Sequence, residues 1–231
     1  MKTVGIIGGI APESTIVYYR SIISGYRQII QDGSYPSILL NSIDMKKMLD
    51  LIGAKHYDKV IQYLLGEIEK LARAGADFGL LASNTPHIVF DDLQQKSPIP
   101  LISIVASACE SCMKQGLKNI GLFGTRFTMQ GHFYADIFSK SGISLVVPDP
   151  QEQDYIHNKY IGELVNGVFL PETRQQLLSI VDRLIEQKGI QGMLLGGTEL
   201  PLILTDETYR DIPLLDTTKI HVEQILGKIL E

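Results

Sequence analysis

Four segments of this sequence contain small polar residues together with glycine, proline or both, in a way that suits the binding of a small acid. Each follows a short apolar run and precedes a candidate helix start; they are residues 8–15, 83–87, 124–128 and 196–201. Proline in the first turn of a helix loses no needed hydrogen-bond donor, and free amides at helix starts attract anions. We therefore expect these loops to bind a molecule with one or two carboxylates. For any single loop, an ordinary helix cap is the alternative.

Two residues of these loops could carry a proton. His87 lies four residues after Ser83, one helical turn away if Asn84 opens a helix. It could act as a proton carrier or a ligand to a substrate oxygen, or it could simply bond a nearby carbonyl. Glu199 follows a glycine pair, and its alternative role is that of a first-turn acid favoured by the helix dipole. The histidines that lie in helical segments without evident partners are expected to be surface or packing residues: His132, His157 and His221.

The two cysteines, Cys109 and Cys112, fit neither a disulfide framework nor a metal site. A closed zinc site needs about four ligands, and the five histidines are scattered along the chain. A redox CxxC pair normally sits at a helix start after a strand, whereas these two lie within a helix-like segment, residues 105–114. We expect buried packing residues here and no metal.

Composition and charge argue against several classes of protein. A net charge of −5 in 231 residues does not suit a nucleic-acid surface, which needs a basic face. No apolar run reaches the roughly 18 residues of a membrane span, and the N-terminus does not resemble a signal peptide. The Gly8-Gly9 turn lacks the third glycine and the later acid of a dinucleotide fingerprint. We expect a soluble, cytoplasmic protein.

Short apolar runs alternate with amphipathic stretches along the chain. The runs lack period-two alternation, which indicates parallel strands covered on both faces. The predicted strands are residues 4–7, 38–40, 78–82, 101–104, 120–123, 144–147, 192–195 and 213–215. The predicted helices are residues 13–30, 57–74, 128–139, 151–166, 170–188 and 218–230. The pattern predicts an α/β fold of mainly parallel sheets flanked by helices.

Two pairs of segments resemble each other at nearly one spacing. Residues 4–9 align with residues 120–125 at an offset of 116, and residues 75–83 align with residues 189–197 at an offset of 114. Chance similarity between apolar strands is the alternative. We interpret the pattern as a duplicated α/β half.

The duplication predicts two pseudo-symmetric lobes. The N-terminal lobe comprises residues 1–100 plus 215–231, and the C-terminal lobe comprises residues 101–214. No linker rich in glycine, serine or proline separates them, so we expect close packing with a cleft between them. Ligands of parallel sheets bind beyond the carboxyl ends of the strands.

The four loops resemble those of the aspartate/glutamate racemase family, which are cofactor-independent amino-acid racemases. The matching motifs are Val4 to Thr15, Asn84-Thr85-Pro86-His87, Gly124 to Met129, and Gly196 with Thr198-Glu199-Leu200-Pro201. Four ordered motifs across essentially the whole chain make the resemblance specific. It implies an active site between two α/β lobes, racemisation of a small acidic amino acid without pyridoxal phosphate or another cofactor, and a homodimer.

Ser83 and Gly197 stand where the family has its two catalytic cysteines. In the family, one thiolate removes the α-proton and the other thiol delivers a proton to the opposite face. A thiol with a pKa of roughly 8.5 can be tuned to the working pH. A serine hydroxyl needs a base, for which His87 is the obvious candidate, and glycine has no side chain. The two-thiol reaction therefore cannot run here, and a natural branch with altered chemistry explains both changes better than an engineered loss of one cysteine.

Most of the binding residues remain, by the same resemblance. The residues implied to hold the substrate carboxylate and amino groups are Asn84, Thr85, Thr125 and Thr198, helped by amides near Gly8 and Gly9. A basic residue after the second strand is expected to meet the side-chain carboxylate. Lys47 is the match, with Lys46 beside it, and such a charged donor suits an acidic substrate.

Three functions remain open on these residues. The first is an isomerase, an amino-acid racemase or epimerase in which His87, Glu199 or bound water supplies the missing proton transfer. The second is another carbanion reaction, by a lyase or isomerase, because decarboxylases resembling this family manage with one thiol. The third is a non-catalytic binder of small dicarboxylic acids.

Overall fold

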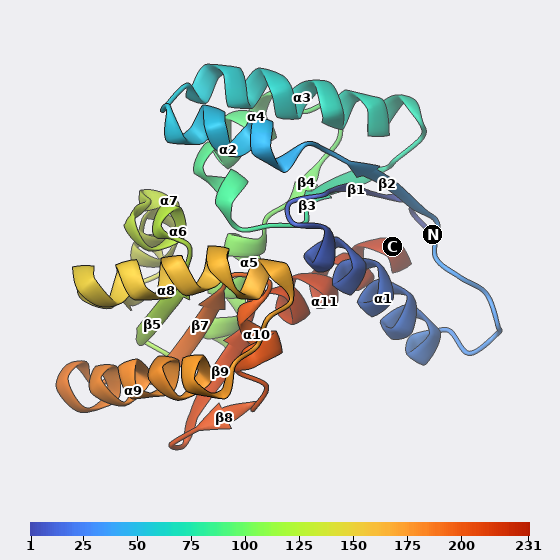
Figure 1. The fold of residues 1–231 in the computed structure, drawn as a ribbon. Coiled ribbons are helices and arrows are strands. Elements are labelled where there is room, and N and C mark those ends of the chain that lie inside the picture. Colours follow the sequence, from blue (N-terminus) through green and yellow to red (C-terminus); the bar gives the residue numbers. More distant parts are fainter. The chain divides into compact units, whose positions relative to one another are not determined.

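The computed structural model describes residues 1–231 and divides the chain into two compact units. The first unit is Met1–Ile104 together with His221–Glu231, and the second is Val105–Ile220. In Figure 1 each unit is a sheet flanked by helices. No helix of the chain combines the length and apolarity that a membrane crossing requires.

The first unit contains a parallel sheet in the order β2-β1-β3-β4. Its strands are β1 (Val4–Gly8), β2 (Ile38–Ser42), β3 (Phe78–Leu81) and β4 (Leu101–Ile102). Its helices are α1 (Pro12–Ile29), α2 (Met45–Gly53), α3 (Tyr57–Arg73), the 3₁₀ helix η1 (Thr85–Val89), α4 (Phe90–Lys96) and most of α11 (Thr217–Leu230). The central strands β1 and β3 are buried throughout, as expected when helices cover both faces of a parallel sheet.

The last helix of the chain completes the core of the first unit. Apolar side chains of α1 and α11 pack with those of β1 and β3, among them Ile6, Ile22, Leu80, Ile225 and Ile229. His221 of α11 is buried, with Nδ1 2.8 Å from the Tyr18 hydroxyl and Nε2 3.0 Å from the Ile102 carbonyl. The sequence shows no partner for this histidine because Tyr18 lies 203 residues away.

The second unit contains a five-stranded sheet in the order β6-β5-β7-β9-β8, parallel except for the β8–β9 pair. Its strands are β5 (Asn119–Gly124), β6 (Ser144–Val146), β7 (Gly192–Gly196), β8 (Thr208–Tyr209) and β9 (Ile212–Asp216). Its helices are α5 (Ile104–Lys114), α6 (Arg126–Gln130), α7 (His132–Lys140), α8 (Pro150–Gly162), the 3₁₀ helix η2 (Leu164–Asn166), α9 (Pro171–Lys188) and α10 (Leu200–Ile203).

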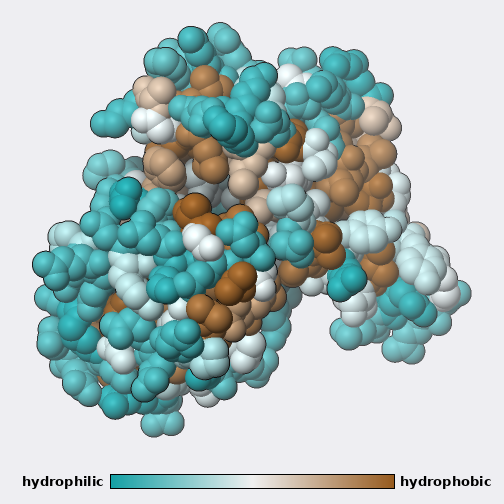
Figure 2. Space-filling model, viewed as in Figure 1, coloured by the Kyte–Doolittle hydropathy of each residue, from teal (hydrophilic) through white to brown (hydrophobic).

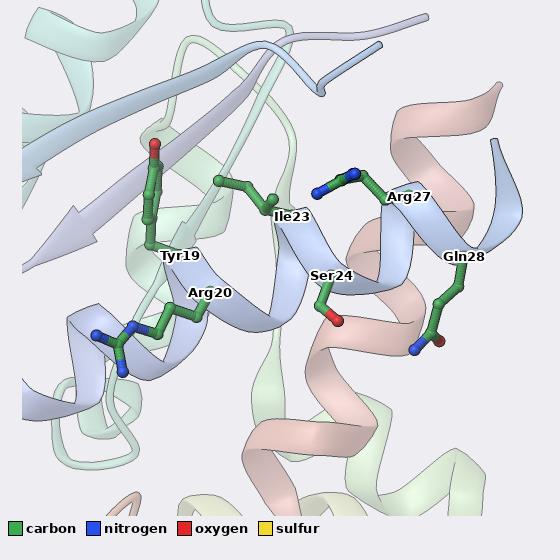
Figure 3. Close-up of a pocket in the computed structure, with 6 residues that line it drawn as sticks. All are labelled: Tyr19, Arg20, Ile23, Ser24, Arg27 and Gln28. Atoms are coloured by element: carbon green, nitrogen blue, oxygen red, sulfur yellow. The ribbon is translucent and has the colours of Figure 1, made fainter. Parts of the chain in front are cut away.

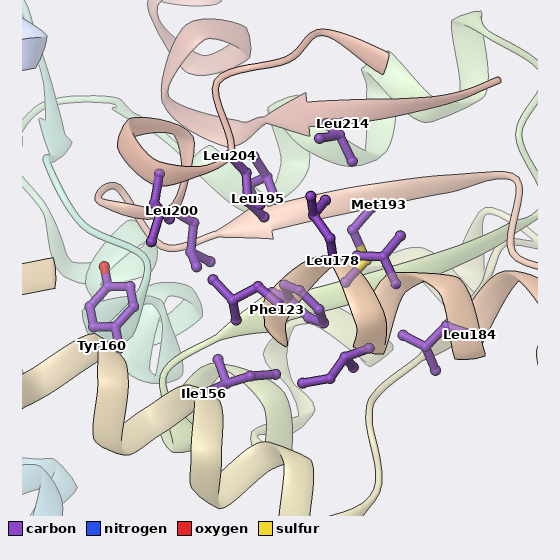
Figure 4. Close-up of a cluster of buried hydrophobic side chains, with 14 of the residues drawn as sticks. Phe123, Ile156, Tyr160, Leu178, Leu184, Met193, Leu195, Leu200, Leu204 and Leu214 are labelled. Atoms are coloured by element: carbon purple, nitrogen blue, oxygen red, sulfur yellow. The ribbon is translucent and has the colours of Figure 1, made fainter. Parts of the chain in front are cut away.

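Helices α8 and α9 pack apolar faces on this second sheet. Leu177, Val181 and Leu184 recur at helical spacing on α9 and are buried. Figure 4 shows Ile156 and Tyr160 of α8 in the same cluster, beside apolar side chains of the strands. The opposite faces of these helices are polar, and Figure 2 shows a largely hydrophilic surface over them. This packing fixes α8 relative to the loop that follows β7.

Strand pairing in the two units follows the offsets of the sequence repeat. Ile6 pairs with Leu80 in the first sheet, and Leu122 pairs with Leu194 in the second. These pairs are equivalent at offsets of 116 and 114. The sheet orders β2-β1-β3-β4 and β6-β5-β7-β9 are equivalent as well. The predicted α/β fold of two pseudo-symmetric, mainly parallel halves is confirmed.

Some element boundaries differ from the prediction. The predicted helix 128–139 is two helices, α6 and α7, because the backbone is extended at Gly131. Helix α2 is absent from the predicted elements; Asp44 caps it by accepting a hydrogen bond from the Lys47 amide at 3.2 Å. The predicted strand 101–104 ends at Ile102, since Ile104 begins α5. Such short elements carry too little periodicity to be recognised in a sequence.

Candidate functional site

In the first unit, two of the four loops predicted to bind a small acid lie at the same edge of the sheet. Residues 8–15 follow β1 and residues 83–87 follow β3, and these strands are adjacent and parallel. The Ser14 hydroxyl is placed to donate to the carbonyl of Ala11 at 2.8 Å and to that of Ala82, at the end of β3, at 3.2 Å. A buried side chain therefore ties the start of α1 to the end of β3.

Gly9 is required by both backbone conformation and space. Its φ of +81° lies in the left-handed region that favours glycine, and a Cβ there would lie 2.7 Å from Ser42 Oγ. The Gly9 amide donates to Thr15 Oγ1 at 2.8 Å, so this amide is already engaged within the loop. Gly8 is confined by the same threonine, because a Cβ there would lie 2.8 Å from Thr15 Oγ1. Both predicted glycines thus shape the loop.

His87 is held as a neutral imidazole with both nitrogens bonded to the backbone. Its side chain is 3% exposed and stacks on Phe90, with ring centroids 4.7 Å apart. Nδ1 lies 3.0 Å from the Ser83 carbonyl, which only accepts, and Nε2 accepts the Ile104 amide at 3.2 Å. The proton is therefore on Nδ1. Burial, followed by the charge of His221, lowers the pKa of His87 to about 3.

The other predicted residues of this loop are gathered around the start of η1. Ser83, Asn84 and Thr85 are buried at the carboxyl end of β3. Pro86 occupies the first turn of η1, where it sacrifices no backbone hydrogen bond. Because both nitrogens of His87 have backbone partners, the first unit gives the Ser83 hydroxyl no histidine base.

Lys47 lies in the first turn of α2, shortly after β2, and β2 is the neighbour of β1. Its side chain is exposed, and Nζ lies 4.2 Å from the centroid of the Tyr63 ring. Lys46 is instead paired with Asp50 of the same helix at 2.5 Å. Within α2, Lys46 therefore has a carboxylate partner, whereas Lys47 forms no ion pair with a carboxylate of the helix.

In the second unit, the other two loops also come together at one sheet edge. Gly124 of β5 lies opposite Gly196 of β7, and a Cβ at Gly124 would lie 2.8 Å from the Gly196 carbonyl oxygen. Thr125 is the N-cap of α6, and its Oγ1 accepts the Thr128 amide at 3.4 Å. The close approach of the two backbones places Thr125 and the loop of residues 196–201 side by side.

His157 of α8 supports the loop of residues 124–128. Its Nδ1 accepts the Arg126 amide at 3.3 Å, and its ring meets Phe127 edge-on, with centroids 6.5 Å apart. The Arg126 guanidinium pairs with Asp154 of the same helix at 2.7 Å. Burial, followed by the charge of Arg126, lowers the pKa of His157. This histidine has a partner that the sequence does not reveal.

Glu199 is buried and receives two hydroxyl donors. Its Oε2 accepts hydrogen bonds from the Tyr160 hydroxyl and from Thr198 Oγ1, the latter at 2.8 Å. Figure 4 shows Tyr160 rising from α8 with its hydroxyl turned toward the chain that leads into α10. Burial, followed by the charge of Glu199, raises the pKa of Tyr160 well above its ordinary value. Tyr160 is absent from the predicted site because it lies 39 residues before Glu199, on a helix face with the pattern of a core.

Position 197 has no room for a side chain. A Cβ at Gly197 would lie 2.8 Å from the Tyr160 hydroxyl oxygen and 2.9 Å from Cζ of the same ring. The backbone at Gly197 is not in the left-handed region. Glycine is therefore needed here because a side chain would not fit, and not because of the backbone conformation. Tyr160 therefore fills the volume that the side chain of residue 197 would enter.

Cys109 and Cys112 are free, buried residues of α5. Burial, followed by Cys109, raises the pKa of Cys112 to about 12, so this thiol is protonated at neutral pH. Both cysteines are packing residues, as predicted. No three histidine, cysteine or acidic side chains gather in a group that could hold a metal ion.

A shallow hollow lies along α1 in the first unit and is drawn in Figure 3. It is lined by Tyr19, Arg20, Ile23, Ser24, Arg27 and Gln28. All six belong to one helix, and none is a predicted site residue. The residues that line the hollow thus belong to none of the four loops.

Sequence comparison relates the chain to racemases over most of its length. The profile of the Asp/Glu/hydantoin racemase family matches residues 7–225. The broad-specificity amino-acid racemase RacX of Bacillus subtilis is 22% identical over 220 residues, which cover 93% of this chain and 92% of RacX.

Solved structures share the fold over the entire chain. A Yersinia pestis protein proposed to be an Asp/Glu racemase superimposes with a TM-score of 0.90 at 31% identity, with 100% of both chains covered. An aspartate racemase homologue from Pyrococcus horikoshii OT3 gives a TM-score of 0.85 at 31% identity, also with 100% of both chains covered. Together with the profile match over residues 7–225, these likenesses show that the chain belongs to the Asp/Glu/hydantoin racemase family.

Proposed function

We propose that this protein binds a small acidic amino acid and exchanges its α-proton without pyridoxal phosphate. The observation that supports this most is the pairing of the predicted loops in both units. Residues 8–15 lie beside residues 83–87, and residues 124–128 lie beside residues 196–201, each pair at the carboxyl ends of adjacent parallel strands. Small molecules bind at this edge of parallel sheets. The relatives named as aspartate, glutamate or broad-specificity racemases support the class of substrate.

We assign the binding of the substrate carboxylate and amino groups to small polar side chains of these loops. They are Asn84 and Thr85 in the first unit, and Thr125 and Thr198 in the second. Hydroxyl groups both donate and accept, which suits a substrate that carries a carboxylate beside an amino group. Gly8 and Gly9 contribute by setting the backbone conformation of the first loop. The Gly9 amide is already bonded to Thr15 Oγ1.

The proton chemistry must differ from the two-thiol reaction of the family. Ser83 and Gly197 stand where the family resemblance implies the two cysteines. A serine hydroxyl is far too weak an acid to supply a base at neutral pH unaided. The remaining candidate is the Glu199 carboxylate of the second unit, which is bonded to two hydroxyls. A lyase that needs one delivered proton and a non-catalytic binder of dicarboxylic acids are the alternative functions.

We also propose that the protein works as a cytoplasmic homodimer and does not bind nucleic acid. The family resemblance supports the dimer, and the net charge of −5 argues against a nucleic-acid partner. Light scattering on the purified protein gives the oligomeric state directly.

Proton exchange tests the proposed function. The protein is incubated in heavy water with the L- and D-forms of aspartate and glutamate, and the α-proton signal is followed by NMR. We expect the signal of at least one of these acids to disappear faster with protein than without it. Exchange with inversion would indicate a racemase, and release of carbon dioxide would indicate a decarboxylase.

A thermal-shift measurement with the same acids separates binding from catalysis. Stabilisation by an acid without any α-proton exchange would reduce the function to binding. Neither stabilisation nor exchange with any of the four acids would contradict the proposal as a whole.

Lys47→Met tests the expected contact with the side-chain carboxylate. The substitution removes the ammonium group and leaves an apolar chain against Tyr63. A hydrogen bond to a charged group contributes about 1.5–3 kcal/mol, so aspartate or glutamate should bind roughly 10- to 100-fold more weakly, while alanine should be affected little.

Lys46→Met is the matched control, because it makes the same change of charge one residue earlier. Calorimetric titration of both variants checks the prediction. Equal weakening in the two variants, or a larger effect in Lys46→Met, would show that Lys47 does not make the contact.

The buried His87 predicts a loss of stability in mild acid. Its folded-state pKa of about 3 lies below the ordinary value of 6.5, so the unfolded chain takes up a proton first as the pH falls. The stability that His87 contributes above pH ~6.5 is therefore lost progressively toward pH ~3. Between pH ~7.5 and pH ~5, one such histidine costs about 2 kcal/mol.

Urea unfolding of His87→Gln at both pH values measures this contribution. The variant should lose less stability between the two pH values than the natural protein, whereas His132→Gln, at an exposed histidine, should behave like the natural protein. An unchanged pH dependence in His87→Gln would contradict the neutral, buried imidazole.

A further inference from the structure

Tyr160 occupies the place of the missing side chain of residue 197. Its hydroxyl oxygen would lie 2.8 Å from a Cβ on Gly197, within reach of where a longer side chain at that position would continue. The tyrosine ring packs in the apolar cluster of the second unit, which also includes Phe123 and Leu200. A polar atom of α8 thus stands next to the loop that the family resemblance makes catalytic.

The Tyr160 hydroxyl is one of two hydroxyls that donate to the Glu199 carboxylate. Tyr160 and Thr198 both donate to Glu199 Oε2. Tyr160, Thr198 and Glu199 are 6%, 4% and 1% exposed, so these three residues are almost entirely shielded from water. A phenol bonded to a carboxylate can pass its proton to the carboxylate when the phenol oxygen takes up another proton in the same step.

We propose that Tyr160, with Glu199 behind it, is the proton carrier of the second unit, in place of a side chain at position 197. This inference rests on the proposed function and specifies its chemistry. The substrate would be a small amino acid held by the neighbouring hydroxyls of Thr125 and Thr198, with its α-hydrogen facing the phenol oxygen.

The proton transfer balances through both residues. The Tyr160 oxygen takes the α-proton while its own hydroxyl proton passes to Glu199, and the electron pair of the broken C–H bond stays on the α-carbon. Tyr160 ends neutral, Glu199 ends protonated, and one negative charge has moved from Glu199 to the substrate. Reversal restores the starting state, and exchange of the held proton with heavy water between the two steps introduces deuterium.

This relay avoids a phenolate beside a carboxylate. Burial and the charge of Glu199 both raise the pKa of Tyr160, which opposes ionisation of the phenol by itself. Movement of the proton to Glu199 as the substrate proton arrives keeps a single negative charge in the site at each stage. The charge of Glu199 therefore favours the coupled transfer over a free phenolate.

A single carrier has a stereochemical consequence. In this proposal the same Tyr160–Glu199 pair both removes and returns the proton. The proton removed by Tyr160 should therefore return to the same face of the α-carbon. Exchange into heavy water should proceed faster than inversion, with retained configuration in most exchanged molecules.

Tyr160→Phe tests the carrier with little change in packing. The variant keeps the ring that fills the space beside Gly197 and loses only the hydroxyl. Its exchange rate should fall by at least ~100-fold, the lower range for a lost general acid or base, while the thermal shift caused by the acid remains. Tyr155→Phe removes a hydroxyl from the same helix and should retain the natural rate.

Glu199→Gln is a second variant that preserves shape and removes the carboxylate, and its exchange rate should fall in the same way. Undiminished exchange in Tyr160→Phe, or rapid inversion by the natural protein, would overturn the inference while the proposed function stands. Binding of the acid without exchange by the natural protein would overturn the carrier role, and absence of binding as well would remove the proposed function itself.

Discussion

Tyr160 and any side chain at position 197 compete for the same volume in the second unit. The tyrosine ring belongs to the apolar cluster that joins α8, α9 and the sheet, so it cannot leave without cost. Its hydroxyl is bonded to Glu199, and Thr198 is bonded to the same oxygen. Glycine at position 197, the course of the loop after β7 and the position of Glu199 all depend on this arrangement. Glycine at position 197 thus matches the packing around it.

The two units place different side chains on equivalent frameworks. Their sheets have equivalent strand orders and registers, and each brings two small polar loops to one edge. In the first unit, the loop after β3 is stabilised by a neutral, buried His87 whose nitrogens are both bonded to the backbone. In the second, the loop after β7 holds a phenol and a carboxylate. The equivalent loops after β3 and β7 therefore carry unlike side chains.

The sequence was sufficient for the fold and for the loops, because these depend on local patterns. Apolar runs followed by small polar residues with glycine, proline or both indicate the strand ends. The offsets of the repeat agree with the observed registers. Contacts between distant residues could not be predicted in this way. Tyr160 lies 39 residues before Glu199 and has the spacing of a core residue, and the bond between Tyr18 and His221 spans 203 residues. Periodicity identifies a buried position, but it does not identify the hydrogen-bond partner of a polar group on that side chain.

A double-mutant cycle on Gly197→Ala and Tyr160→Ala tests the shared volume most directly. Urea unfolding of the four proteins gives the cost of the added methyl group with and without the tyrosine. Overpacking a filled site costs about 1–3 kcal/mol, so Gly197→Ala should destabilise the natural protein by that amount. In the Tyr160→Ala background the same change should cost at least ~1 kcal/mol less, a coupling expected only of residues in contact. Equal costs in the two backgrounds would contradict the claim that Tyr160 excludes a side chain from position 197.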